Sequence, residues 1–241
     1  GTINYLQAAT NLINAIKASE VYAGYNSLQL GDWANGGSMQ NGTRPSDFIF
    51  DHLRSFQVAT GDVTWNNVLN KCYSLISRMQ TSYSPNTGLI PDFIQKTDGT
   101  ASPAPANYLE GPNDGAYYYN SCRVPWHLGC DYVLNGDSRA KTACDKINSW
   151  IRSKASNNSA NIRAGYKLNG NNISGNNYQE LCFISPFSVS AMVSSSNQAW
   201  LNNLWSNIIN FNVVDGGYYG NTIKMINMII VSGNMWTPQS N

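Results

Sequence analysis

The sequence predicts an all-α fold, a toroid of helical hairpins. Apolar residues recur near the helical period through most of the chain, and strand-like alternation is scarce. Short turns and long loops alternate between the predicted helices, as in consecutive antiparallel hairpins. About eight helices can be identified, whereas a closed toroid of six hairpins needs twelve, so either the toroid has fewer pairs or the chain is part of a larger toroid. At 241 residues the length of the chain fits one domain or at most two, and we expect one.

The first element is an amphipathic helix near the start of the chain. Its apolar face is formed by Ile3, Leu6, Leu12, Ile13 and Ile16, whose spacing follows the helical period.

Three helical hairpins follow. The first joins "SDFIFDHLRSFQVATGD", which starts with a capping Ser46 behind Pro45 and stops at Gly61, to "TWNNVLNKCYSLISRMQ", which starts at Thr64. The second joins "YYYNSCRVPWHLGCDYVLNGD" to "SRAKTACDKINSWIRSKA", and the third joins "SVSAMVSSS" to "QAWLNNLWSNIIN". Each joint is a tight turn, so each pair is antiparallel.

The connections outside the hairpins are long and rich in Gly, Asn, Pro and aromatic residues. They cover residues 22–44, 84–115, 157–185 and 212–217, and a last helix over residues 218–232 ends at Gly233. Because antiparallel helices alternate in direction, every long connection emerges at the same end of the fold. We expect that end to be the functional face.

The composition favours a carbohydrate partner. Charged residues make up 12% of the chain and the net charge is +1, so we expect neither a nucleic acid nor a membrane partner. The longest apolar run, residues 225–231, is far shorter than the roughly 20 residues of a membrane-spanning helix. Fourteen Tyr and seven Trp, with abundant Asn, Ser and Gly, suit stacking on sugars, although aromatics also fill cores. Few Lys and Glu and the Asn-rich loops indicate a secreted, extracellular protein.

The cysteines indicate no cofactor chemistry. Five cysteines leave an odd thiol, and Cys122 and Cys130, about 12 Å apart along one predicted helix, cannot bridge each other. A disulfide between Cys130 and Cys144 across a hairpin is the alternative to the buried free thiols that we expect. No Cys/His spacing is typical of a metal site, so we expect neither a metal nor an organic cofactor.

Carboxylates are concentrated on the predicted functional face. Eight of them accompany only about four basic residues there, which predicts an acidic cleft mouth. These carboxylates are Asp32, Asp47, Asp92, Asp98, Glu110, Asp114, Glu180 and Asp215. His52 and His127 are interpreted as core or hinge residues.

Two loops combine carboxylates with aromatic residues, as a glycosidic-bond hydrolase requires. Such an enzyme needs an acid for the leaving oxygen and a base for water, with aromatic floors for the sugars. "LGDWANGGSMQNGTRPSDF" supplies Trp33 with Asp32, Arg44 and Asp47, and "NYLEGPNDGAYYYN" supplies Glu110 with three tyrosines. The alternative, that Asp47 caps a helix and the tyrosines only pack, stays open.

Five fragments in order resemble glycoside hydrolase family 8. They are "LGDWA", "TRPSDF", "TGD", "SPNTGLIPDF" and "YYYNSCRVPW", and the resemblance extends from Gly1 to about Trp236. The resemblance implies an inverting endo-glycanase on an (α/α)6 barrel.

The resemblance also implies residue roles. Many family members place the general base, an Asp, at the position held here by Asn120, and an amide cannot accept the proton of water. The sequence is similar to the subgroup of chitosanases, lichenases and cellulases whose base is a Glu on the preceding inserted loop, here Glu110. Tyr119 and Arg123 match positions that orient the base and water. The implied substrate-binding residues are Trp33, Asp32, Arg44, Asp47, Tyr117, Trp126 and Tyr219.

Two family motifs have no counterpart in this sequence. These are the "SEGQGYG"-like motif with the general acid and the "DGDLDIAY"-like motif; Glu20 in "KASEVYAGY" does not fit, because it lies in the wrong order relative to "LGDWA". Residues 1–241 therefore resemble the C-terminal two thirds of one catalytic domain. We expect the rest as a separate N-terminal fragment of the same enzyme.

These observations together predict an endo-acting, inverting glycoside hydrolase that cleaves a β-1,4-linked polysaccharide. Chitosan is the first expectation, because an acidic cleft concentrates a polycation. The alternatives are an endo-β-glucanase of the same family, a carbohydrate-binding fragment without catalysis and a structural or partner-binding domain.

Overall fold

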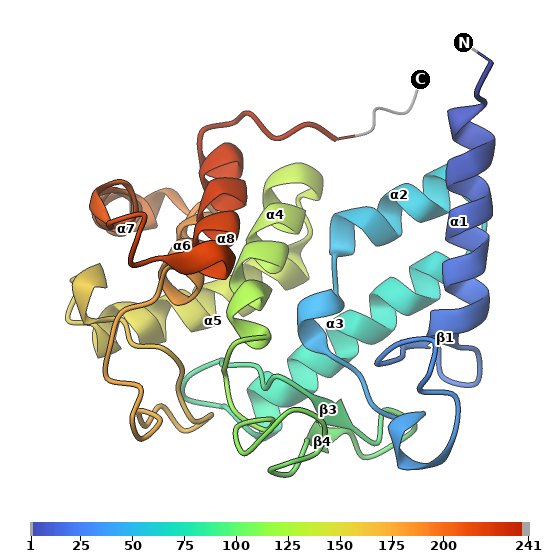
Figure 1. Ribbon diagram of the computed structural model, residues 1–241, viewed down its shortest axis with the longest axis horizontal. Coiled ribbons are helices and arrows are strands. Elements are labelled where there is room, and N and C mark those ends of the chain that lie inside the picture. Colours follow the sequence, from blue (N-terminus) through green and yellow to red (C-terminus); the bar gives the residue numbers. More distant parts are fainter. Residues whose placement is uncertain (1, 238–241) are drawn as a thin grey trace.

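The computed structural model of the protein describes residues 2–237 and is mainly helical (Figure 1). Over these residues the helices are α1 (Tyr5–Glu20), α2 (Phe50–Thr60), α3 (Thr64–Ser82), α4 (Val124–Asn135), α5 (Ser138–Lys154), α6 (Leu181–Ala191), α7 (Gln198–Asn210) and α8 (Gly217–Val231). Two short antiparallel ribbons lie in the loops, β1 (Val21–Tyr22) with β2 (Ser27–Leu28) and β3 (Ile94–Gln95) with β4 (Ser102–Pro103). The all-α prediction is confirmed.

The helices form consecutive antiparallel hairpins, as predicted. Gly61 ends α2 and Gly136 ends α4, both in the left-handed conformation that glycine adopts without a steric penalty. Helix α4 packs against α2 and α6, and α6 packs against α8, while α3, α5 and α7 are their hairpin partners. Helices α1 and α8 therefore lie at opposite ends of an open row of helices (Figure 1).

Three helices begin elsewhere than the sequence predicts. Helix α4, predicted to start in the run of tyrosines at Tyr117, begins at Val124 after a separate 3-10 turn over Ser121–Arg123. Helix α2 starts at Phe50 because Pro45–Asp47 forms a separate 3-10 turn, and the hydroxyl of Ser46 accepts a hydrogen bond from Arg123 instead of capping α2. Helix α6 starts at Leu181, inside the predicted loop. Every residue of α6 is buried, so this helix has no amphipathic pattern to detect.

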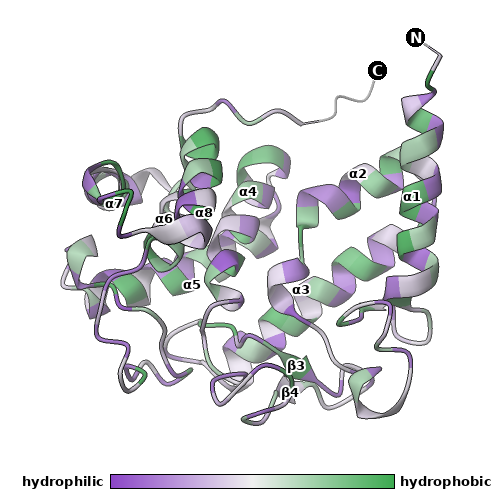
Figure 2. Ribbon diagram, in the orientation of Figure 1, coloured by the Kyte–Doolittle hydropathy of each residue, from purple (hydrophilic) through white to green (hydrophobic). Residues whose placement is uncertain are grey.

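Helix α1 has the predicted amphipathic pattern but little to pack against. Only Ile13 of this helix is buried, while Leu6 and Leu12 are exposed. Figure 2 shows hydrophobic residues along α1 on the outside of the molecule. None of the described helices is long and apolar enough to span a bilayer.

A buried ionic network ties the core helices together. The carboxylate of Asp131 on α4 is inaccessible to solvent and accepts two hydrogen bonds from Arg54 on α2, at 2.7 and 2.9 Å, and one from the hydroxyl of Tyr73 on α3. Arg54 also contacts Asp137 at 2.7 Å, in the turn between α4 and α5. All five cysteines are buried free thiols, so the alternative disulfide between Cys130 and Cys144 is not formed.

The long connections before α2, α4 and α6 gather along one edge of the row, at the same end of the helices, as predicted. The segments before α2, α4 and α6 lie together at the lower edge of Figure 1. Backbone pairs between Thr43 and Ile94 and between Tyr117 and Tyr166 join these segments. We call this end the loop face.

Candidate active site

The predicted base, Glu110, lies on a compact turn of the loop face. The carboxylate of Asp114 accepts hydrogen bonds from the backbone N–H groups of Leu109, Glu110 and Gly111, at 2.7, 3.0 and 2.9 Å. The turn is also closed by the N–H of Asn107, which donates to the carbonyl of Gly111 at 2.8 Å. The side chain of Glu110 is 50% exposed, so its carboxylate faces solvent from a fixed backbone.

Two side chains from other segments hold the carboxylate of Glu110. Arg44 Nη2 lies 3.0 Å from Glu110 Oε1, and Asn120 Nδ2 donates to Oε2 at 2.7 Å. The structure therefore brings Glu110 and Asn120 together. The amide at position 120 is a hydrogen-bond donor to the carboxylate and has no basic oxygen pair of its own.

A second, buried carboxylate, Asp92, fixes the backbone around Asn120 by hydrogen bonds. Asp92 is 2% exposed and accepts from the backbone N–H groups of Tyr118, Asn120 and Ser121 and from the hydroxyl of Ser121, at 2.7 to 3.2 Å. Burial raises the pKa of Asp92 to about 6, while these donors act in the opposite direction. The sequence interpretation counted Asp92 among the acidic residues without a role, although a carboxylate inside the apolar run "LIPDF" is a signal of a buried acceptor.

Two arginines flank Asp47 beside this pair. Arg44 and Arg123 lie 3.6 and 3.8 Å from its carboxylate, and Arg123 also donates to the hydroxyl of Ser46 at 2.7 Å. The guanidinium of Arg44 lies 5.1 Å from the centre of the Phe93 ring. The arginines therefore have fixed positions, and Asp47 is one of their partners; the alternative left open by the sequence, that Asp47 caps a helix, is wrong, since Ile49 precedes α2.

Tyrosines form one wall of the loop face. The hydroxyls of Tyr119 and Tyr178 lie 3.0 Å apart, and the hydroxyl of Tyr219 donates to the carbonyl of Tyr119 at 2.6 Å. Tyr178 and Tyr219 are 44% and 39% exposed. The sequence interpretation missed Tyr178, which lies in a long connection without a motif.

The loop with Trp33 adjoins the turn with Glu110. Trp33 is 54% exposed, and its indole nitrogen lies so close to Gly31 that a Cβ there would approach it to 2.6 Å. Leu30 and Ala34, on either side, pack in one cluster with Leu109. Asp32, on the same loop, is exposed to solvent. The exposed ring is therefore carried by a loop that packs against the Glu110 turn, and the predicted contacts of Trp33 and Asp32 with substrate stay predictions.

Two predicted substrate contacts lie elsewhere. Tyr117 is 1% exposed and packs against Phe183 and Phe187, so the prediction that it contacts substrate is wrong, because this ring lies in the core. Trp126 is half-buried on α4, against the apolar cluster of Cys130. A contact of Trp126 with substrate stays a prediction.

The loop face is less acidic than the count of carboxylates predicts. Asp92 and Asp114 are buried behind the site and accept backbone hydrogen bonds. Asp47 and Glu110 are paired with arginines. The acidic cleft was inferred from a count that treats every carboxylate as exposed and free, so the main argument for a polycationic substrate is weaker than the sequence indicates.

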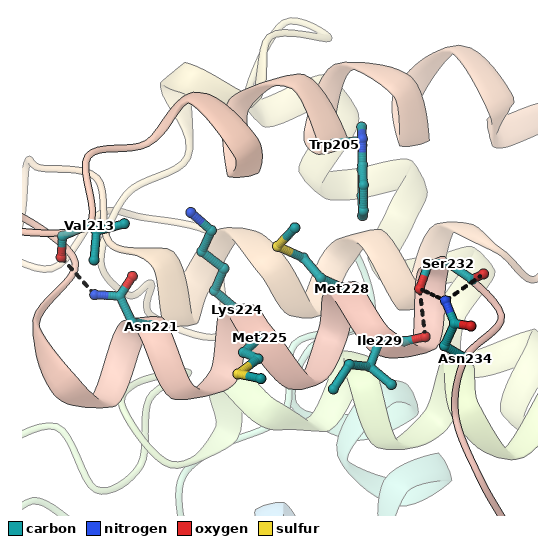
Figure 3. A pocket seen from close by; sticks show the side chains of 9 residues that line it. All are labelled: Trp205, Val213, Asn221, Lys224, Met225, Met228, Ile229, Ser232 and Asn234. Atoms are coloured by element: carbon teal, nitrogen blue, oxygen red, sulfur yellow. Dashed lines mark hydrogen bonds between the residues drawn. The ribbon is translucent and has the colours of Figure 1, made fainter.

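A hollow of about 500 Å³ between α7 and α8 is the main rival to this site (Figure 3). Figure 3 shows Met225, Met228 and Ile229 of α8 and Trp205 of α7 around it. No carboxylate lines this hollow, so it lacks the acid and base of glycosidic hydrolysis. Among residues 2–237 there is also no cluster of His, Cys, Asp and Glu suited to a metal ion.

An open row of helical hairpins with a carboxylate, arginines and tyrosines on its loop face defines the scaffold and site type of a carbohydrate-active protein. The family model described as "Glycosyl hydrolases family 8" matches residues 1–233. The chain belongs to this family, which confirms the resemblance seen in its sequence fragments.

The most informative relatives are glucanases. A protein named Beta-glucanase from Niallia circulans is 48% identical over 237 residues, which cover 98% of this chain and 57% of that protein. An endoglucanase from Bacillus sp. (strain KSM-330) is 40% identical over 99% of this chain and 50% of its own length. The solved apo structure of a beta-1,3-1,4-glucanase from Paenibacillus sp. X4 matches with a TM-score of 0.94 at 48% identity, over 99% of this chain and 62% of that chain. The chain thus spans between half and two thirds of these relatives and shares their (α/α)6 fold in part.

Proposed function

We propose that this chain is the larger part of the catalytic domain of an endo-β-glucanase. The observation that carries the proposal is the half-exposed carboxylate of Glu110, fixed between Arg44 and Asn120 on the loop face of a family 8 fold. The names of the relatives, beta-glucanase and endoglucanase, support hydrolysis of a β-glucan. The predicted roles of the site residues are part of this proposal.

Glu110 acts as the general base in the proposed reaction. A water between Glu110 and the sugar attacks the anomeric carbon, Glu110 takes the proton of that water, and the bond to the leaving oxygen breaks. Asn120 and Arg44 keep the carboxylate oriented toward the water. Arg123 and Tyr119 belong to the segment that positions Asn120.

The proton donor is assigned to a segment that is not in this sequence. An inverting enzyme needs a second carboxyl group about 6.5–9.5 Å from the base. The family motif that would supply it has no counterpart among the 241 residues. A polymer as large as a β-glucan also meets the enzyme outside the cell, and we propose a secreted protein on that ground.

A neutral β-glucan is the proposed substrate in place of chitosan. The pairing of Asp47 and Glu110 with arginines and the burial of Asp92 and Asp114 leave fewer free carboxylates on the loop face to attract a polycation. The named relative with a solved structure is a beta-1,3-1,4-glucanase, which suits a mixed-linkage glucan. The half-exposed Trp33 and Tyr219 supply stacking surface that does not depend on substrate charge.

The test compares hydrolysis of three polymers by the full-length enzyme that contains this chain. We expect reducing sugar to be released faster from mixed-linkage β-glucan than from carboxymethyl cellulose or chitosan. Proton NMR of the first product should show the α-anomer, since inversion of a β-linkage gives it. Fastest cleavage of chitosan, suppressed by salt, would restore the polycation hypothesis and overturn this proposal.

A further inference from the structure

The carboxylate of Asp114 is the most enclosed polar group of the Glu110 turn. Asp114 is 3% exposed, so its side chain cannot contact a polymer. It accepts hydrogen bonds from three consecutive backbone N–H groups, at residues 109–111. Charged acceptors form shorter and stronger hydrogen bonds with N–H groups than neutral ones do.

The middle donor of the three belongs to Glu110 itself. Its N–H lies 3.0 Å from Asp114 Oδ2, so the position of the Glu110 backbone depends directly on that oxygen. The partners of the Glu110 side chain, Arg44 and Asn120, come from other segments of the chain. A shift of the turn would therefore move the carboxylate relative to both partners.

Asp114 is itself anchored to the body of the loop face. Its carbonyl accepts from the N–H of Phe93 at 3.0 Å, and Phe93 is completely buried. At the next position, a Cβ on Gly115 would approach the carbonyl oxygen of Ala104 to 2.3 Å, so only glycine permits this close contact. Asp114 thus connects the rigid segment around Phe93 to the exposed turn of Glu110.

We propose that Asp114 is a positioning residue for Glu110, acting through the backbone of the 109–111 turn. The inference rests on the proposed function, in which Glu110 is the general base. Misplacement of a reacting group by about 1 Å can lower a rate about 10²-fold. We expect Asp114→Ala to lower kcat on β-glucan by about this factor while KM changes less than threefold. Asp114→Asn keeps one acceptor oxygen and should lose less.

The matched control is Asp62→Ala. Asp62 also accepts a backbone hydrogen bond in a turn, from the N–H of Thr64 at 2.9 Å, but this turn joins α2 and α3 away from the loop face. Both alanine variants should lower the melting temperature. Only Asp114→Ala should lower the kcat of the folded enzyme, measured well below the melting transition.

Amide hydrogen exchange tests the inference without any activity. In Asp114→Asn and Asp114→Ala, the amides of residues 109–111 should exchange faster, while those of α3 stay protected. An unchanged kcat in Asp114→Ala, or unchanged exchange at residues 109–111, would overturn the positioning role. An inactive wild-type enzyme would refute the proposed function, whereas an active wild type with an equally active Asp114→Ala would refute only the role of Asp114.

Discussion

Replacing Arg44 by methionine removes the ionic contact to the proposed base, together with the longer contact of Arg44 to Asp47 at 3.6 Å. The Arg44 side chain is 23% exposed, lies over the ring of Phe93 at 5.1 Å, and contacts Glu110 Oε1 at 3.0 Å. Methionine keeps an unbranched apolar stem against Phe93 and removes the guanidinium. The packing on the ring is therefore largely kept, and the carboxylate of Glu110 keeps Asn120 as its remaining hydrogen-bond partner.

The expected loss follows from one charge-assisted hydrogen bond. Such a bond contributes about 1.5–3 kcal/mol, and each 1.36 kcal/mol corresponds to a factor of ten in rate. Arg44→Met should therefore lower kcat about 10- to 150-fold. Lysine supplies one charged point in place of the planar fork and cannot contact Glu110 and Asp47 as arginine does, so Arg44→Lys should fall between the wild type and Arg44→Met.

The assay is reducing-sugar release from mixed-linkage β-glucan by full-length enzyme at saturating substrate. Circular dichroism at the assay temperature controls for folding, and Lys141→Met, which removes an exposed cation paired with Asp145 on α5, is the matched charge control. Lys141→Met should keep full activity. If folded Arg44→Met keeps more than half of the wild-type kcat, Arg44 does not hold the base in its working position and the account of the site is wrong.

Three further predictions concern stability and substrate contact. Arg54→Met leaves the buried carboxylate of Asp131 without its ionic partner and should lower the free energy of unfolding by about 3–5 kcal/mol, measured by urea denaturation; a loss below 1 kcal/mol would contradict it. Burial, helped by Arg123, lowers the pKa of His127 from its ordinary 6.5 to about 3, so the stability from neutral His127 is complete above pH 6.5 and is lost as the pH falls toward 3. Between pH 7 and pH 5 the free energy of unfolding of the wild type should fall by about 2 kcal/mol from this cause, measured by urea denaturation. His127→Gln lacks the titrating group and should not show this fall; equal falls in both proteins would refute the argument. Trp33→Ala removes an exposed ring and should raise KM for β-glucan several-fold with little change in melting temperature, and an unchanged KM would exclude the ring from the substrate path.

Helix pairs were predictable from the sequence where one face is polar and a glycine ends the helix. Helix α3 begins at Thr64 as predicted, because its apolar period is regular and half its surface meets solvent. Helix α6 was placed too late, since a helix that is buried on all sides shows no period. The start of α2 was wrong because Pro45 suits a 3-10 turn as well as a helix start.

Sequence motifs located the segments of the candidate site, whereas they did not show which residues of those segments are buried. The amide at position 120 directed attention to Glu110, and the structure brings the two within 2.7 Å. Three consecutive tyrosines, Tyr117, Tyr118 and Tyr119, are alike in sequence, yet only Tyr117 is buried in the core, and the residue types do not reveal this difference. Asp92 and Asp114 were counted as surface charges, since a sequence does not show which carboxylates are enclosed by backbone N–H groups.

The most direct test of the central claim is the activity of Glu110→Gln. Glutamine keeps the size of the side chain and can still accept from Asn120, but it cannot take a proton from water. The account predicts that folded, full-length Glu110→Gln binds β-glucan as the wild type does and hydrolyses it about 10²- to 10⁴-fold more slowly. Hydrolysis within a factor of three of the wild type would contradict the assignment of Glu110 as the base.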